Sequence, residues 1–283
     1  MDLKFKTAYC ALNDYEPMEV DHKYVNIYVR LTDRCNAHCA FCVYCSEKCR
    51  FNIVKFKQSV AKLLQNDIVI NKVSFTGGEP TLRTARLDAC VSYIREVSPD
   101  TFIVVNTNGV NIDAIPEEVD SIALSRHHYN DAINYSVFDS KILPSTMMLD
   151  MFKHKGKIHL SCNLIKGYID SKEELYKYLE FAASVGIYDV GFVGLMNVNN
   201  YAKKHFVDII KLNVESDRLV CNKVWHYKKS CKCKNYLYMP KAGNKLVKFY
   251  ARHRCKHTTD MGSNIVFDGE HLRQNFNGKI INL

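Results

Sequence analysis

The chain has 283 residues, 47% of them apolar, which suits one large α/β domain or a domain with a small appendix. No apolar run approaches the roughly 20 residues that cross a bilayer, and the first six residues (Met-Asp-Leu-Lys-Phe-Lys) lack the apolar core of a signal peptide. We therefore expect no membrane segment and a cytoplasmic location. The net charge of +9 suits an anionic partner such as nucleic acid, a nucleotide or an acidic peptide, and it suits a solvated lysine-rich surface equally well.

Strand-like and helix-like segments alternate from Tyr24 onward, after a lead-in of 23 residues. This alternation is typical of βα units and a parallel sheet. The predicted strands cover 24–32, 68–75, 101–106, 121–125, 157–165 and 189–196, and the predicted helices cover 55–66, 84–97, 112–119, 145–153 and 172–185. Beyond Asn200 the alternation stops.

The twelve cysteines are more than packing requires, and most fall in two groups, at 35–49 and 221–255. In a chain expected to be intracellular, this grouping indicates metal sites in a reducing compartment rather than disulfides. Cys10, Cys90 and Cys162 stand alone and are expected to be small buried hydrophobes.

Three cysteines follow the first predicted strand at C-x3-C-x2-C spacing: Cys35, Cys39 and Cys42. Three thiolates on one short loop can hold three irons of a [4Fe–4S] cluster. The fourth iron is then left open to a small molecule. A rival interpretation is a zinc site formed by Cys39, Cys42, Cys45 and Cys49.

The segment Gly77-Gly78-Glu79-Pro80 follows the second predicted strand, and its glycines allow the backbone to approach a cofactor closely. With the cysteine loop, this segment resembles the radical SAM superfamily. The resemblance implies an α/β fold built as a partial (β/α)6 TIM-type barrel. It also implies a [4Fe–4S] cluster whose open iron is chelated by S-adenosylmethionine, which is cleaved to a 5′-deoxyadenosyl radical. In this family the Gly-Gly-Glu-Pro segment binds the methionyl amino group, and Phe41 matches the aromatic residue before the third cysteine.

The resemblance places further cofactor contacts at strand ends, where the active sites of parallel barrels gather. Arg126 is expected to pair with the cofactor carboxylate, Asn163 to face the ribose, and Met196 to lie where backbone groups hold adenine. The remaining expected contacts are Thr107, Asn108 and Ser125. Each of these residues could instead meet water or cap the next helix.

His127 and His128 follow the fourth predicted strand, where a substrate would approach. We expect one of them to hydrogen-bond an anionic or carbonyl group of the substrate, or to transfer a proton. Surface-loop histidines without such a role are common, and this remains the alternative.

The second cysteine group has the spacing C-x9-C-x-C-x21-C at Cys221, Cys231, Cys233 and Cys255, among many basic residues. Its position after a six-fold barrel resembles the twitch-type auxiliary-cluster extension of some radical SAM enzymes. We expect a second [4Fe–4S] cluster here; a zinc site helped by a nearby histidine, or unligated cysteines, are the alternatives. A strand within 263–269, ending in an Asp-Gly turn, is expected to continue a small sheet of this extension.

These patterns predict a lead-in (1–23), a radical SAM partial barrel (24–200) and a C-terminal cysteine-containing extension (201–283). The predicted enzyme cleaves S-adenosylmethionine and abstracts hydrogen from a small molecule, anionic or nucleotide-like, or from a peptide. Its electron donor is expected to be a protein such as flavodoxin or ferredoxin. The alternative from another class is a non-enzymatic zinc or iron–sulfur protein that regulates or binds nucleic acid.

Overall fold

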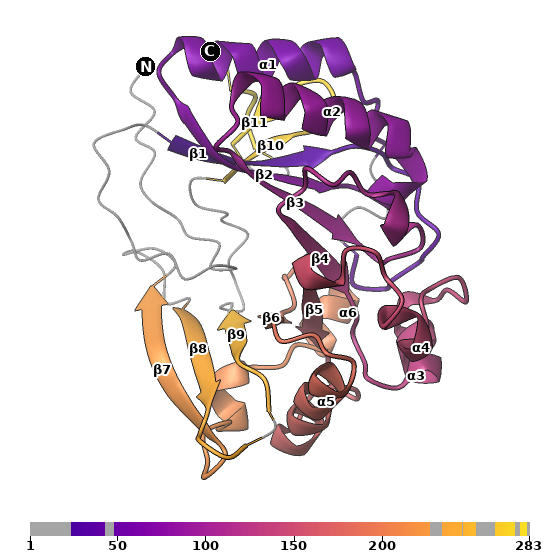
Figure 1. Cartoon of the computed structure of the whole chain (residues 1–283), viewed down its shortest axis with the longest axis vertical. Coiled ribbons are helices and arrows are strands. Elements are labelled where there is room, and N and C mark those ends of the chain that lie inside the picture. The colour runs from indigo at the N-terminus through magenta and orange to yellow at the C-terminus, as the bar shows by residue number, and fades with distance from the viewer. Residues whose placement is uncertain are drawn as a thin grey trace.

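In this computed structural model, the structure describes residues 24–42, 48–226, 234–244, 246–252, 264–274 and 278–281. The predicted lead-in lies outside the described residues. Helices and strands alternate up to about residue 200, and mostly strands follow (Figure 1). The strands are β1 (Tyr24–Arg30), β2 (Val69–Thr76), β3 (Phe102–Thr107), β4 (Ser121–Ser125), β5 (Ile158–Leu164), β6 (Val190–Gly194), β7 (Leu219–His226), β8 (Lys234–Pro240), β9 (Phe249–Arg252), β10 (Asn264–Phe267) and β11 (Leu272–Arg273). The helices are α1 (Ile53–Gln65), α2 (Thr84–Val97), α3 (Asp131–Phe138), α4 (Thr146–Leu149), α5 (Lys172–Ser184) and α6 (Asn200–Lys204), with short 3-10 turns at Pro80–Arg83, Ile112–Ala114, Lys155–Lys157 and Ile209–Leu212.

Strands β1 to β6 lie side by side in chain order, and each pairs in parallel with the next. This confirms the α/β class and the six parallel strands of a partial barrel. Two C-terminal strands extend the same sheet: β10 pairs in parallel with β1, and β9 pairs in parallel with β6. The prediction that the 263–269 strand continues a separate small sheet is therefore wrong. Without these two strands, β1 and β6 would be the edges of the sheet and would expose free backbone groups. Strands β10 and β9, from far along the sequence, pair with those groups.

The helix boundaries show where local signals were sufficient. Asn52 caps α1 by accepting hydrogen bonds from two backbone N–H groups, so this helix begins two residues before the predicted start. Ser171 Oγ accepts the Glu174 N–H at 3.2 Å, as a capping box predicts. The helices predicted at 112–119 and 145–153 are reduced to a 3-10 turn and to the single turn α4. The sequence analysis missed α3, which Asn130 caps.

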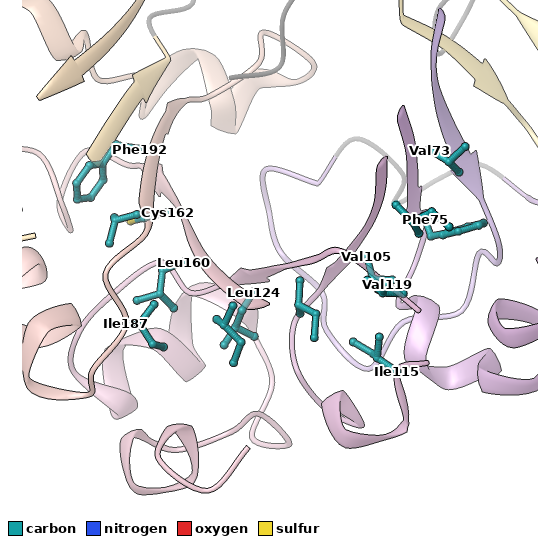
Figure 2. Packing of buried hydrophobic residues seen from close by; sticks show 14 of the residues in the cluster. Val73, Phe75, Val105, Ile115, Val119, Leu124, Leu160, Cys162, Ile187 and Phe192 are labelled. Atoms are coloured by element: carbon teal, nitrogen blue, oxygen red, sulfur yellow. The ribbon is translucent and has the colours of Figure 1, made fainter. Parts of the chain in front are cut away.

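The hydrophobic core lies between the sheet and its helices, because alternate strand residues point outward. Val73, Leu124 and Phe192 come from three different strands and belong to one continuous cluster with α1, α2 and α5 (Figure 2). The opposite, inward face is much more polar, and we call the space it surrounds the lumen. Residues of that face that line cavities include Tyr28, Asn106, Ser125, His159, Ser161 and Asn163. None of the described helices has the length and apolar character needed to traverse a bilayer.

Candidate active site

The backbone joins the two sequence motifs directly. Gly78 N–H donates to Thr32 O, and Glu79 N–H donates to Arg34 O, both at 2.7 Å. Gly77 adopts φ +126°, a conformation that L side chains rarely adopt. A Cβ on Gly78 would lie 2.1 Å from Arg34 O, so only glycine permits this approach. The Gly-Gly segment is thus fastened to the chain that enters the cysteine loop.

Glu79 organises the ends of β2 and β3. Its side chain is 2% exposed and accepts hydrogen bonds from Thr81 N–H and Oγ, from Thr107 Oγ at 2.7 Å and from Asn108 N–H at 2.7 Å. Burial raises the pKa of the Glu79 carboxyl, and the donated hydrogen bonds oppose this shift. Glu79 therefore fixes Thr107 and Asn108 in place, although its own oxygens are occupied by the protein.

Ten of the predicted cofactor or catalytic residues and all three loop cysteines meet at one cavity of about 280 Å³ at the carboxyl ends of the strands. In parallel barrels this is the end that carries the active site. The predicted residues that line it are Cys35, Cys39, Cys42, Phe41, Gly77, Gly78, Glu79, Thr107, Asn108, Ser125, His127, Asn163 and Met196.

The cysteine loop is held from several sides. Asn108 Nδ2 donates to Asn36 Oδ1 at 2.8 Å, His38 N–H donates to Phe138 O at 2.9 Å, and Asn199 Nδ2 donates to Ala40 O at 2.9 Å. These contacts come from the residue after β3, the end of α3 and the cap of α6. The loop is therefore positioned by tertiary contacts on both sides of the cavity.

Burial keeps the thiols of the cysteine loop protonated unless a metal is bound. Burial, followed by the neighbouring Cys42 and Cys35 thiols, raises the pKa of Cys39 to about 12, and burial raises that of Cys35 too. Such thiols ionise when a metal supplies positive charge. Among the described residues, no three Cys, His, Asp or Glu side chains converge as a single metal ion would require. Cys35, Cys39 and Cys42 all line the one cavity.

The rival zinc set receives no support from the described part of the chain. Cys45 lies outside the described residues. Cys49 is buried, and its Sγ lies 3.2 Å from Arg30 O and 3.3 Å from Asp268 O, either of which can accept the single thiol proton. Its sulfur therefore belongs to the packing between β1 and the turn after β10.

His127 is neutral in this site. Its ring stacks on Phe138 with centroids 4.7 Å apart and meets Phe41 edge-on at 5.1 Å. Burial lowers the pKa of His127 to about 3. Nδ1 accepts the Asn163 N–H at 3.1 Å, which leaves the proton on Nε2. The ring can donate a hydrogen bond into the cavity, and its low pKa makes it a poor acid.

Three predicted residues do not line the cavity. The Arg126 guanidinium points to the helix side, where it contacts Asp131, Thr146 Oγ1 and the Pro144 and Tyr129 carbonyls. This corrects its expected place, because Ser125 takes the inward position and adjacent strand residues alternate. His128 also lies outside: Nδ1 accepts the Asn130 N–H, and Nε2 lies 3.9 Å from a Glu174 oxygen. Pro80 begins a 3-10 turn behind the cavity.

Several lining residues were missed by the sequence analysis. Phe138 comes from the unpredicted α3, so no local signal pointed to it. Asn106, Ser161 and Val193 alternate with core residues on their strands, and this period of two was a usable signal. Of the second cysteine group, Cys221 lies on β7, while Cys231, Cys233 and Cys255 lie outside the described residues.

Comparisons with known proteins agree with this geometry. GTP 3′,8-cyclase of Syntrophomonas wolfei is 26% identical over 187 residues, covering 61% of this chain and 55% of that protein. GTP 3′,8-cyclase of Nautilia profundicola is 30% identical over 176 residues, covering 57% and 53%. The chain therefore spans little more than half the length of these relatives.

Solved structures share the fold. Streptococcus suis SuiB bound to S-adenosylmethionine matches with a TM-score of 0.51 and 18% identity, covering 64% of this chain and 43% of SuiB. SuiB bound to its precursor peptide SuiA matches with the same score. The radical SAM superfamily profile matches residues 29–212. This range includes the cysteine loop, the Gly-Gly segment, the last two residues of β1 and all of β2 to β6. The chain belongs to the radical SAM superfamily, whose members are enzymes that use a [4Fe–4S] cluster and S-adenosylmethionine.

Proposed function

We propose that Cys35, Cys39 and Cys42 hold the [4Fe–4S] cluster and that the adjoining cavity binds S-adenosylmethionine. The observation that carries this proposal is the convergence of the three thiols and the Gly77–Gly78 backbone on one cavity. When bound, the cluster supplies the electron that cleaves S-adenosylmethionine to a 5′-deoxyadenosyl radical, which abstracts hydrogen from the substrate.

The protein's part is to bind, orient and exclude water. The Gly77–Glu79 backbone approaches the cofactor closely, while Glu79 holds Thr107 and Asn108 at the cavity wall. Phe41, His127 and Phe138 form an aromatic wall beside the cysteine loop, and such a wall excludes water from a reactive intermediate. His127 offers an Nε2–H donor whose proton stays in place at neutral pH.

The substrate lies in the lumen, beneath the cofactor cavity. A small anionic molecule is favoured, because the segment around the second cysteine group is rich in basic residues; a peptide is the second candidate. The electron donor is an external protein such as flavodoxin or ferredoxin, and Cys35 is exposed, which supports electron entry at the loop. We also retain a second [4Fe–4S] cluster at Cys221, Cys231, Cys233 and Cys255, and a cytoplasmic location, which suits oxygen-labile clusters.

The test is anaerobic reconstitution with iron and sulfide, followed by dithionite and S-adenosylmethionine. The wild type should be brown and form 5′-deoxyadenosine, whereas single alanine variants of Cys35, Cys39 or Cys42 should form none. Cys49→Ser is the matched control, since it removes a cysteine of the rival zinc set and should keep activity. A colourless zinc protein, or wild-type amounts of 5′-deoxyadenosine in the loop variants, would overturn the proposal.

A further inference from the structure

A second, smaller cavity of about 90 Å³ lies in the lumen and adjoins the cofactor cavity, since Asn106, Ser161 and Val193 line both. Its wall is completed by strands from the C-terminal part of the chain. Asn235 on β8 stands opposite Arg252 on β9, and Arg252 in turn stands opposite Val193 on β6. Figure 1 shows β9 between β6 and β8, and residues of β8 and β9 line the cavity.

Asn235 carries an unsatisfied donor into this cavity. The residue is 3% exposed, and its Nδ2 has no hydrogen-bond partner in the part of the chain that the structure describes. A buried amide nitrogen without an acceptor costs about 1–3 kcal/mol. An acceptor on a bound molecule would remove this cost.

His159 lines the same cavity from β5 and is 3% exposed. Its Nδ1 lies 3.2 Å from Asp189 Oδ1, so the carboxylate faces one side of the ring. Its Nε2 lies against Gly191, where an added Cβ would be only 2.8 Å away. The missing side chain at position 191 is what makes room for the imidazole at the cavity wall.

The described residues that line the cavity carry polar and basic side chains. Arg252 supplies a guanidinium, and Tyr28, Tyr250 and Ser161 supply hydroxyls, while no carboxylate is among the described residues that line it. A cavity of this size, rich in donors, matches one oxyanion group in size and charge.

We infer that this cavity is an oxyanion subsite that binds a phosphate or carboxylate group of a small-molecule substrate through Asn235, Arg252 and His159. The inference rests on the proposed function, because the rest of that substrate would extend toward the cofactor cavity. The C-terminal strands β8 and β9 thereby select the substrate, in addition to closing the sheet edge.

The experiment measures binding of inorganic phosphate, and separately of acetate, to the reconstituted, S-adenosylmethionine-bound protein by anaerobic equilibrium dialysis. The wild type should bind at least one of the two ions with a dissociation constant in the millimolar range or below. The stronger ion identifies the group as phosphate or carboxylate. Absence of saturable binding of both ions up to about 50 mM overturns the inference.

Asn235→Asp is the decisive variant. It keeps the side-chain shape, replaces a donor with a carboxylate, and places that carboxylate opposite Arg252, so the fold is supported while the anion is repelled. We expect at least tenfold weaker binding. Gly191→Ala, which must displace the His159 ring, should also weaken binding. Lys62→Gln removes one positive charge from the exposed face of α1 and should bind as the wild type does. Unchanged binding in Asn235→Asp overturns the inference.

The two proposals fail separately. Formation of 5′-deoxyadenosine by the wild type without anion binding would reject the subsite and leave the radical SAM assignment of the cavity intact. Anion binding without formation of 5′-deoxyadenosine would support the subsite and reject the assignment of the larger cavity to S-adenosylmethionine cleavage.

Discussion

Gly78 lies so close to Arg34 that a Cβ at position 78 would be 2.1 Å from the Arg34 carbonyl oxygen. The Gly78 N–H also donates to Thr32 O at 2.7 Å. The backbone after β2 and the backbone that leads into the cysteine loop therefore form one unit. A cofactor bound to one of these segments touches the other.

The first prediction concerns this contact. Gly78→Ala should separate the two segments, and we expect at least a tenfold loss of S-adenosylmethionine affinity together with reduced iron content, because the loop that presents the cysteines moves. Gly156→Ala is the matched control, since nothing lies within 4 Å of an added Cβ there. Anaerobic binding titration and iron analysis measure both effects. Wild-type affinity in Gly78→Ala would show that the close contact has no role in the site.

The second prediction concerns Glu79, whose oxygens hold the ends of β2 and β3 together. Glu79→Ala should lower the free energy of unfolding by about 3 kcal/mol or more, because several buried donors lose their acceptor. It should also weaken S-adenosylmethionine binding, since Thr107 and Asn108 are released. Glu117→Gln, at an exposed ion pair with Lys153, is the control and should leave both quantities unchanged. Urea denaturation under anaerobic conditions is the measurement, and an unaltered unfolding midpoint in Glu79→Ala would contradict the role.

The third prediction is a pH dependence that arises at His127. Its folded-state pKa of about 3 lies below the ordinary 6.5, so the unfolded chain binds a proton between these values that the folded protein rejects. Stability should therefore fall as the pH drops below 6.5. Relative to His127→Gln, the wild type should lose roughly 1 to 2 kcal/mol of unfolding free energy between pH 6.5 and pH 5. Denaturation curves at several pH values measure this difference, and parallel curves for the two proteins would show that the ring is not buried neutral.

The fourth prediction concerns the C-terminal cysteines. If Cys221, Cys231, Cys233 and Cys255 bind a second cluster, the variant with Cys35, Cys39 and Cys42 all replaced by alanine should still hold about four irons, with a distinct spectroscopic signal. Iron analysis and electron paramagnetic resonance measure this. Zinc in place of iron would assign the site a structural role, and absence of both metals would contradict a metal site there.

The sequence by itself determined the parts of this protein that depend on local chemistry. Cysteine spacing on one loop predicts a cluster site, and two adjacent glycines predict a close backbone approach. Alternation of apolar patterns also predicted β1 to β6 and the three long helices α1, α2 and α5, because the hydrophobic period follows from backbone geometry.

Only the tertiary structure decided which residues meet. Because side chains alternate along a strand, the sequence predicts that Ser125 and Arg126 face opposite sides. It does not predict which of these sides is the lumen. The pairing of β9 with β6 joins chain segments more than 50 residues apart, which no local pattern encodes. For the same reason the meeting of His159 with Asn235 and Arg252 at one cavity emerged only from the fold, because closing the sheet edge is a non-local event driven by backbone pairing and burial.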